Sequence, residues 1–326
     1  MANGKMGRDS GRLRKKMKED IRKMLLNAGA VAVGFAEAGE IDPQFHETYE
    51  KWIGEGCNGE MGYLERHIPL RRNTNHVLQG AKTVISLAFD YTPSEWRDNR
   101  LPYIASYAYG DDYHILLKEL LTPVVNGLKN KFGGKWRISI DSAPLAERYW
   151  ALKSGIGKRG LNGSVIINGT GTLCFLVEIL TTIEIEADKP SHESCSGCNA
   201  CIKVCPAKAL RGDGTMDARK CINYLTIEKK EEFTEEETNL INSESGYLYG
   251  CDRCLRICPH NKEKDDTNPP HKLFKYSIKD LSVDAILSME EEEFKQFFQR
   301  SPLLYAGYER LRRNAMALKT KSTGNI

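Results

Sequence analysis

The stretch CSGCNACIKVCP, residues 195–206, carries four cysteines and a proline in the spacing C-x2-C-x2-C-x3-C-P. This is the ligand run of bacterial ferredoxins that hold [4Fe–4S] clusters. Three cysteines at two-residue intervals wrap one cluster, and the fourth, here Cys205, ligates the other cluster of a two-cluster module. The run therefore predicts a ferredoxin-like domain with two clusters and requires further cysteine ligands elsewhere in the chain.

A second run, GCDRCLRICPHN at residues 250–261, keeps the end of the same motif but has Leu248 where a leading cysteine would stand. The crossed ligation rule gives Cys258 to the first cluster and Cys205 to the second. One vacancy then remains, and Cys221 is the one cysteine left inside the block. The predicted ligand sets are Cys195, Cys198, Cys201 and Cys258 for one cluster, and Cys205, Cys221, Cys251 and Cys254 for the other.

Cysteine usage in the whole chain supports this interpretation. Eight of the ten cysteines fall between residues 195 and 258, while Cys57 and Cys174 lie outside and are expected to be ordinary thiols. Zinc binding or free thiols are the alternative for the eight, but no histidine stands at zinc-finger spacing. In an intracellular chain such a cysteine density indicates metal or redox chemistry rather than disulfides.

Composition limits the class of protein. The 326 residues are 28% charged and 40% hydrophobic with a net charge of +3, as in globular proteins, and they permit a polyanionic partner without requiring one. The basic N-terminus lacks the apolar core of a secretory signal, and no apolar stretch is long enough to span a membrane. We therefore expect a cytoplasmic protein that is a monomer and has no membrane partner.

The first 186 residues read as a layer of alternating strands and helices. Residues 13–28 and 111–133 have helical periodicity, and residues 30–36, 81–91 and 136–144 read as strands. The near-continuous apolar character of 81–91 favours a central strand. Residues 165–168 and 172–185 are predicted to form a hairpin around the Gly169–Gly171 turn.

The predicted fold class is α+β, with an α/β domain followed by the ferredoxin-like domain and a short C-terminal helical segment. The boundaries are a disordered basic tail at 1–12, an α/β domain at 13–186, the two-cluster domain at 187–268 and the helical segment at 269–326. Residues 222–250 form an insertion with a charged helix, and 265–274 read as a linker. Ser288 and Glu291 have capping-box spacing, which predicts a helix over 288–298.

One further feature of the first domain bears on function. No G-x-G-x-x-G follows a strand, which argues against a nicotinamide fold. Asp141 ends the third predicted strand, a place where sites of open α/β sheets gather. The motif DSAPLAER (141–148), then G-x-G-x-x-G-x-N from Gly155, then the two cysteine runs, resembles the epoxyqueuosine reductase family. EMGYLERH (60–67), YAYGDDYHILLK (107–118) and LRRNAMAL (311–318) resemble it as well.

The resemblance implies an oxidoreductase that reduces epoxyqueuosine to queuosine at the wobble position of tRNA, the last step of queuosine biosynthesis. It implies cobalamin beside the two clusters, and an architecture related to reductive dehalogenases. Asp141 matches the catalytic acid, which would suit the role if burial keeps it protonated. Tyr224 matches a tRNA contact. The cobalamin contacts that the resemblance implies are Val165, Ile222, Gly250, Cys251, Asp252, Arg253 and Cys254.

Expected partners are the tRNA anticodon loop and an external electron donor such as a flavodoxin or ferredoxin. Tyr63 or Tyr224 could receive the modified base, and tRNA phosphates would meet basic side chains. Candidates for these are Arg66, Arg71, Arg72, Arg219, Lys220 and Arg312. The chain departs from the family pattern at Leu161, where a lysine is common, and at His260, where tryptophan is common. It is also shorter than members with a helical-repeat tail, so a weaker grip on tRNA is expected.

Several alternatives stay open on the sequence alone. Asp141 could instead cap the strand or pair with Arg148, and His114 or His67 could act as the acid. The protein could be a reductive dehalogenase-like enzyme acting on a small molecule, although no twin-arginine signal is present. It could also be a non-catalytic electron-transfer protein, which would leave the first domain unexplained.

Overall fold

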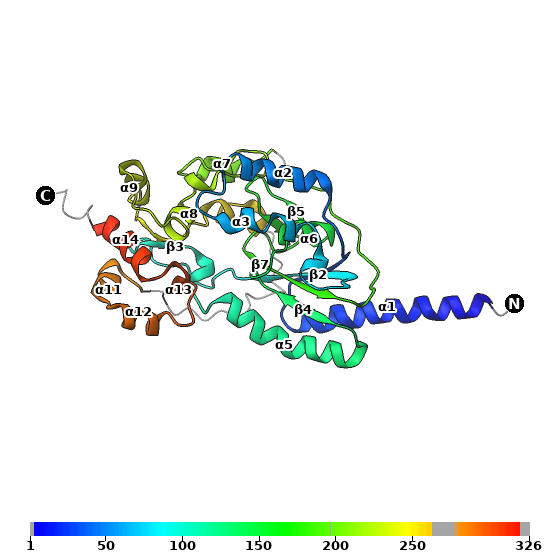
Figure 1. The fold of residues 1–326 in the computed structure, drawn as a ribbon. Coiled ribbons are helices and arrows are strands. Elements are labelled where there is room, and N and C mark those ends of the chain that lie inside the picture. Colours follow the sequence, from blue (N-terminus) through cyan, green and yellow to red (C-terminus); the bar gives the residue numbers. More distant parts are fainter. Residues whose placement is uncertain (1–2, 196, 263–277, 279, 320–326) are drawn as a thin grey trace.

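A computed structural model describes residues 3–195, 197–262, 278 and 280–319. Its main sheet has the order β1-β2-β7-β4, and every neighbouring pair is antiparallel (Figure 1). The strands are β1 (Ala32–Glu37), β2 (Thr83–Asp90), β4 (Trp136–Ser139) and β7 (Cys174–Thr181). The predicted central position of β2 is confirmed, because all eight of its residues are buried. Alternating strands and helices usually accompany parallel pairing, but here the sheet is antiparallel throughout.

Helices cover both faces of this sheet. Helices α1 (Asn3–Asn27) and α5 (Tyr113–Phe132) pack on one face, where Phe35, Leu87 and Ile179 meet Leu121 in a shared core. Helix α6 (Glu147–Lys153) packs on the other face through Trp150. Alternate residues of each strand therefore serve two separate cores, as the period of two along a strand requires.

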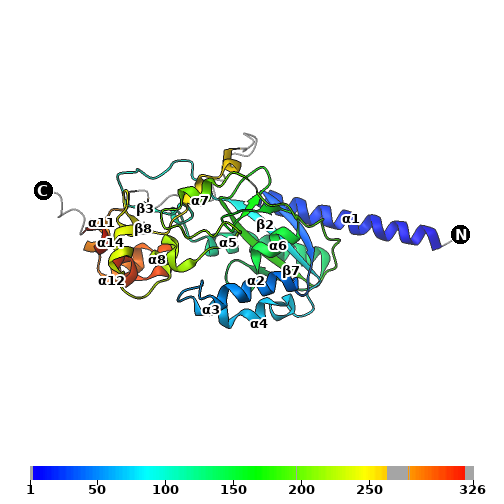
Figure 2. The same cartoon turned by 90° about the horizontal axis from the view of Figure 1, so that it is seen from above.

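Helix α1 begins at Asn3 and projects beyond the body of the molecule (Figure 2). The sequence predicted a helix only from residue 13, after a disordered tail. In the structure the helical backbone continues through most of that segment, since no proline interrupts it and glycine weakens a helix without ending it.

The predicted hairpin of residues 165–168 and 172–185 is limited to one antiparallel bridge between Ile167 and Gly171 across the predicted turn. Strand β6 (Val165–Ile167) pairs instead with β5 (Gly157–Arg159), while β7 leaves to join the main sheet. The turn between them is fixed by Asn261, whose side-chain oxygen accepts a hydrogen bond from the Thr172 N–H at 2.8 Å. A Cβ on Gly171 would lie 2.2 Å from that same oxygen, so the turn packs too tightly for any other residue.

The cluster region is built from short elements. These are α7 (Ala200–Val204), η3 (Ala218–Lys220), α8 (Ile222–Ile227), α9 (Glu235–Ile241), β8 (Tyr247–Tyr249), α10 (Arg253–Arg256) and η4 (Pro259–Lys262). The charged helix predicted in the insertion is α9, which opens with a capping box from Thr234 to Glu237. Strand β8 pairs in parallel with β3 (Tyr103–Ile104), which ties the insertion to the first domain.

The C-terminal helices share one core with the insertion. They are α11 (Val283–Ser288), α12 (Glu291–Phe297), α13 (Leu303–Ala306) and α14 (Tyr308–Lys319). The buried side chain of Asn314 donates to the carbonyls of Thr226 at 2.8 Å and Leu248 at 3.0 Å, so α14 clamps α8 and β8 together. The helix predicted over 288–298 is α12, but it begins at Glu291 behind Glu290 without a side-chain cap, so the predicted capping box is absent and Ser288 instead ends α11. The predicted linker at 265–274 lies outside the described residues.

The remaining elements lie between β1 and α5. They are α2 (Pro43–Gly54), α3 (Gly62–Arg66), α4 (Ile68–Arg71), η1 (Thr74–His76) and η2 (Ser106–Ala108). Helices α2 and α3 lie above the sheet near α6 and face the cluster region (Figures 1 and 2). The first domain thus meets the cluster region at the side where β4 ends.

Candidate active site and cluster-binding cysteines

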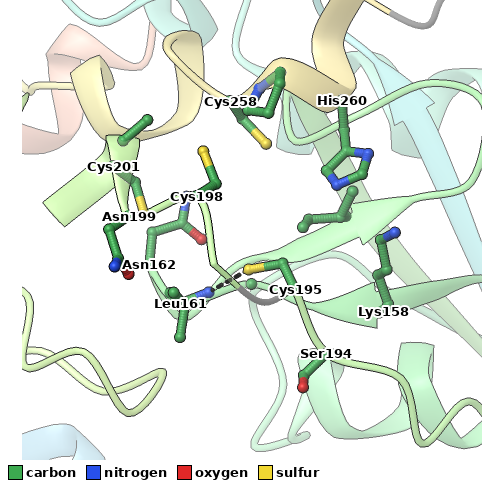
Figure 3. A pocket seen from close by; sticks show the side chains of 14 residues that line it. Lys158, Leu161, Asn162, Ser194, Cys195, Cys198, Asn199, Cys201, Cys258 and His260 are labelled. Atoms are coloured by element: carbon green, nitrogen blue, oxygen red, sulfur yellow. Dashed lines mark hydrogen bonds between the residues drawn. The ribbon is translucent and has the colours of Figure 1, made fainter.

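The first predicted ligand set surrounds a cavity. Cys195, Cys198, Cys201 and Cys258 all line a space of about 260 Å³, together with Lys158 and His260 (Figure 3). Burial raises the pKa of the Cys258 thiol, and the neighbouring charges of Cys195, Cys201 and Cys198 raise it further. The structure therefore brings together three cysteines of one run and the last cysteine of the other, in the crossed arrangement.

The second set also gathers, but deeper in the protein. Burial raises the pKa of Cys251 to about 12, and the charges of Cys221 and Cys205 act in the same direction. Burial also raises the pKa of Cys254, and the charges of Cys251, Cys221 and Cys205 raise it further. Cys221 directly precedes α8, so this isolated cysteine lies beside Cys205 and the 251–254 turn.

The two quartets suit clusters better than single ions. Zinc needs its sulfur ligands at about 2.3 Å from one point. Among the described residues, no three histidine, cysteine or acidic side chains converge closely enough to hold one metal ion. Four sulfurs around a wider space are what an iron–sulfur cluster requires, because its iron and sulfide atoms occupy the centre.

Backbone amides point at two of these sulfurs. The Leu161 N–H donates to Cys195 Sγ at 3.1 Å, and the Ala209 N–H donates to Cys205 Sγ at 3.4 Å. Hydrogen bonds to cluster sulfurs raise or lower reduction potentials. The donor at residue 161 is a backbone group, so the change from the family's lysine to leucine leaves it in place. Lys158, which lines the same cavity, is the nearby cation (Figure 3).

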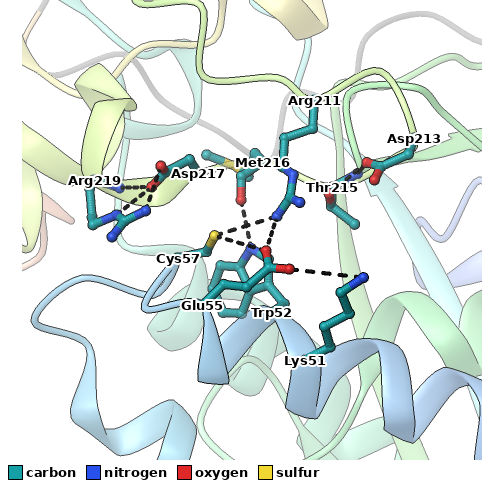
Figure 4. A network of polar contacts seen from close by, with 10 residues as sticks. All are labelled: Lys51, Trp52, Glu55, Cys57, Arg211, Asp213, Thr215, Met216, Asp217 and Arg219. Carbon is teal, nitrogen blue, oxygen red and sulfur yellow. Dashed lines mark hydrogen bonds and ion pairs between the residues drawn. The ribbon is translucent and has the colours of Figure 1, made fainter.

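A polar network holds the loop before Cys221 against the first domain (Figure 4). Arg211 pairs with Glu55 at 2.5 Å, and its guanidinium also lies 3.5 Å from the Cys57 sulfur. The indole N–H of Trp52 donates to the Met216 carbonyl at 2.6 Å. The network therefore anchors the 211–216 loop to the end of α2 and helps to place the second quartet.

Asp141 lies just beyond β4 in a left-handed backbone conformation with φ of 51°. Its Oδ2 accepts a hydrogen bond from the Tyr113 hydroxyl at 2.8 Å and lies 3.9 Å from Nε2 of His114. The side chain is 61% exposed, so the expectation that burial keeps it protonated is not met in this structure. Its observed partners also differ from the alternative pairing with Arg148.

Tyr113 and His114 come from the start of α5. The Asp112 side chain caps this helix by accepting the His114 N–H at 2.8 Å. Burial lowers the pKa of His114, but its hydrogen bond to Asp112 and the charges of Asp112 and Asp141 outweigh this and raise it overall. Burial and the charge of Asp141 raise the pKa of Tyr113, so its hydroxyl keeps its proton and donates. Sequence reasoning missed Tyr113, although it lies within the quoted motif YAYGDDYHILLK.

Two further carboxyl groups lie near Asp141. The Asp141 N–H donates to Glu147 Oε1 at 2.7 Å. Burial and the charge of Asp141 raise the pKa of Glu147 to about 8. Glu178 on β7 is fully buried, and burial together with the charges of Glu147 and Asp141 raises its pKa well above the usual value. Sequence reasoning missed both, although Glu147 is part of DSAPLAER and Glu178 breaks an apolar strand.

The segments expected to contact cobalamin meet in one region. Asn162, three residues before Val165, donates to the Cys254 carbonyl at 3.1 Å. The Gly250 N–H donates to Thr226 on α8, the helix that begins with Ile222. Val165, Ile222 and Gly250 therefore lie on adjoining segments, and all three are buried in this structure. Apolar side chains and backbone are groups of the kind that a large cofactor contacts, and the assignment of these three residues to cobalamin stays a prediction.

Two of the expected cobalamin contacts are already engaged by protein groups. Asp252 is buried and accepts hydrogen bonds from the Ser106 N–H at 2.8 Å, the Ser106 hydroxyl and the Tyr103 hydroxyl. Arg253 pairs with Glu244 and donates to the Tyr247 hydroxyl at 3.0 Å. These side chains of the turn therefore have protein partners, and their predicted contact with a cofactor stays a prediction.

The structure buries Tyr224, whose predicted contact with tRNA stays a prediction. Its side chain is 5% exposed, and its hydroxyl accepts the Glu60 N–H at 2.9 Å. Its ring packs where a Cβ on Gly59 would stand, so it joins α8 to the 56–61 loop and offers no face to a base. Tyr63 on α3 is half-buried, and burial with the charges of Glu228, Tyr305 and Asp141 raises its pKa. Of the two tyrosines, Tyr63 is therefore better placed than Tyr224 to stack on the modified base.

Comparison with known proteins follows the same division of the chain. Residues 71–142 match the family model described as epoxyqueuosine reductase QueG, DUF1730, and residues 194–261 match the 4Fe-4S double cluster binding domain. A relative from Cyclobacterium marinum named epoxyqueuosine reductase is 33% identical over 312 residues, which cover 93% of this chain and 97% of the relative. The chain belongs to the epoxyqueuosine reductase family.

Solved structures of epoxyqueuosine reductases have the same fold. One, with an epoxyqueuosine-modified tRNA-Tyr stem loop, matches with a TM-score of 0.83 and 26% identity over 94% of this chain and 81% of that one. Another, from Bacillus subtilis, has its catalytic aspartate loop swung out of the active site. It matches with a TM-score of 0.80 and 26% identity at the same coverage. No helix in the described part of this family member has the length and apolar character needed to cross a membrane.

Proposed function

We propose that this protein reduces the epoxide of epoxyqueuosine in tRNA and so completes queuosine, acting in the cytoplasm. The observation that carries the proposal is the likeness to named epoxyqueuosine reductases over 93% of the chain. The reaction removes the epoxide oxygen as water and leaves an alkene, which consumes two electrons and two protons. The chain must therefore accept electrons, deliver them to the substrate and place a proton donor at the epoxide oxygen.

The cofactors are two [4Fe–4S] clusters and cobalamin. The two cysteine quartets would hold the clusters, and Val165, Ile222 and the backbone of 250–254 would hold cobalamin. When bound, the clusters supply electrons one at a time and cobalamin supplies the reduced cobalt at which the epoxide is reduced. Cys198 is the exposed cysteine of the first quartet. An external one-electron donor, such as a flavodoxin or ferredoxin, would reduce that quartet's cluster.

Asp141 acts as the proton donor to the epoxide oxygen. The Tyr113 hydroxyl occupies Oδ2, so Oδ1 is the oxygen that carries the transferable proton. Because the side chain is exposed in this structure, the bound tRNA and cofactor would supply the shielding that a protonated carboxyl needs. In the Bacillus subtilis relative the catalytic aspartate loop is swung out of the active site, so the corresponding turn after β4 needs contacts that keep it in place.

Replacing Asp141 with asparagine tests the assignment. We expect D141N to bind its iron and modified tRNA normally but to lose about 10²–10⁴-fold in kcat, the usual contribution of a positioned acid. Asp111→Asn, at an exposed carboxylate that pairs with Arg300, is the matched control. The measurement is nucleoside mass spectrometry of epoxyqueuosine tRNA after incubation with the reduced, cobalamin-loaded enzyme. Full activity in D141N would remove Asp141 from the mechanism, and no conversion by the wild type would overturn the function.

A further inference from the structure

We propose that Glu147 is a positioning residue whose carboxyl group holds the Asp141 backbone, and with it the acid, in the reactive position. The inference rests on the proposed role of Asp141, but it concerns a hydrogen bond that can be measured independently of catalysis. It assigns a task to the second acidic residue of the DSAPLAER motif.

The backbone at Asp141 is in an uncommon conformation that a contact can stabilise. Its φ of 51° lies in the left-handed region, which few non-glycine residues adopt, although aspartate does so more readily than most. The Asp141 N–H would face solvent in the exposed turn, but it donates to Glu147 Oε1 at 2.7 Å instead. This bond closes the turn between the end of β4 and the first residue of α6.

Glu147 is itself firmly placed. It begins α6, whose next residues, Tyr149, Trp150 and Ala151, are buried against the sheet. The turn ahead of it is fixed as well, because Arg71 donates to the Leu145 carbonyl at 2.7 Å. Because Glu147 belongs to a helix packed on the sheet, its hydrogen bond can restrain the backbone of the exposed Asp141.

The two hydrogen bonds of Asp141, with Tyr113 and with Glu147, restrain different parts of the residue. Tyr113 binds the carboxylate oxygen and orients the side chain, whereas Glu147 binds the amide and fixes the backbone. Either protonation state of Glu147 can accept the bond through Oε1. The hydrogen bond that fixes the Asp141 backbone therefore needs an acceptor oxygen at hydrogen-bond distance and does not require a negative charge. Glutamine should preserve it, while aspartate and alanine should not.

Hydrogen–deuterium exchange on the purified, cluster-loaded protein tests this directly. In Glu147→Ala we expect the Asp141 amide to exchange at least about tenfold faster, and kcat to fall while KM for tRNA stays near the wild-type value. Glu147→Gln should keep both the slow exchange and most of kcat. Glu309→Ala, which removes a glutamate from the first turn of α14 at the other end of the molecule, is the matched control (Figure 1).

The outcomes separate this inference from the proposed function. Unchanged exchange in Glu147→Ala overturns the hold, as does a Gln variant that behaves like the Ala variant, since that would make charge the requirement. If Glu147→Ala binds less iron than wild type, the test uses the other two variants. Glu147→Gln should keep the slow exchange of the Asp141 amide, and Glu147→Asp should lose it. Faster exchange in Glu147→Ala together with full activity in D141N would confirm that Glu147 fixes the Asp141 backbone but would reject Asp141 as the acid.

Discussion

Cys221 stands apart from the other cysteines in the sequence yet adjoins Cys205, Cys251 and Cys254 in space. It immediately precedes α8, so its position is set by a helix packed in the core that the insertion shares with the C-terminal helices. We predict that Cys221→Ser loses one cluster, with iron falling from about eight to about four atoms per chain, because a [4Fe–4S] cluster is held by four cysteine thiolates. Cys174→Ser, at a half-buried cysteine of β7, should keep the full iron content. Equal iron in the two variants would contradict the assignment.

Sequence spacing predicted the cysteine quartets because ligand geometry is local and the remaining cysteine followed by elimination. The surroundings of Tyr224 and Asp252 could not be predicted in this way. Tyr224 is buried by Gly59 and Glu60, and Asp252 by Tyr103 and Ser106, all of which are more than a hundred residues away in the chain. Whether a polar side chain faces a cofactor or another part of the protein depends on such distant contacts.

Strand β7 places Glu178 between two serines of the neighbouring strands. Ser86 on β2 and Ser139 on β4 are its register partners, and all three side chains are buried. Its folded-state pKa lies above the unfolded value, so the folded protein holds a proton that the unfolded chain releases above about pH 4.5. The contribution of Glu178 to stability must therefore decline as pH rises above that value.

A substitution can measure this effect. Glutamine is neutral at every pH, so Glu178→Gln should be more stable than the wild type at pH 8. The difference should shrink as the pH falls from 8 towards 5, because the unfolded wild-type chain then releases less of the Glu178 proton that the folded protein holds. Denaturant unfolding of both proteins across this range is the measurement, with Glu186→Gln at an exposed site as the control. A pH-independent difference would show that Glu178 is ionised in the folded protein.

At the level of elements, periodicity predicted the long helices and the buried strands but not which strands pair. The turn at 169–171 reads as a hairpin, yet Asn261 binds it and directs β7 into the main sheet. Likewise Ser288 and Glu291 match a capping box, but Ser288 ends the preceding helix and Met289 is extended, so the predicted helix begins only at Glu291. In both cases a contact or backbone angle outside the local pattern decides the structure.

Across the whole molecule, the basic residues expected to meet tRNA divide into two groups. Arg72 pairs with Glu50 at 3.0 Å and Arg219 with Asp217 at 2.8 Å, and Arg71 and Arg312 donate to backbone carbonyls. Arg66 and Lys220 are exposed at the ends of α3 and η3, close in sequence to Tyr63 and Cys221. The second group is better suited to phosphate contacts, since the first already has protein partners.

We therefore predict that Arg66→Ala and Lys220→Ala each weaken tRNA binding. Each lost phosphate contact should also reduce the slope of log affinity against log salt by about one. Arg72→Ala, which removes a paired surface arginine, is the control and should leave the slope unchanged. Titrating labelled tRNA at several salt concentrations would measure both quantities, and a slope that falls equally in all three variants would contradict the division.

The crossed cysteine sets have a consequence for biosynthesis. One quartet needs Cys258 from the second run, and the other needs Cys205 from the first, so neither can be completed from a single run. A nascent chain has no finished ligand set until residue 254, and it completes the set that lines the outer cavity at residue 258. The clamp from Asn314 on α14 forms later still. A complete ligand set for either cluster therefore exists only after residue 254 of the 326 has been synthesised, so cluster assembly on four cysteines is a late event in the making of this chain.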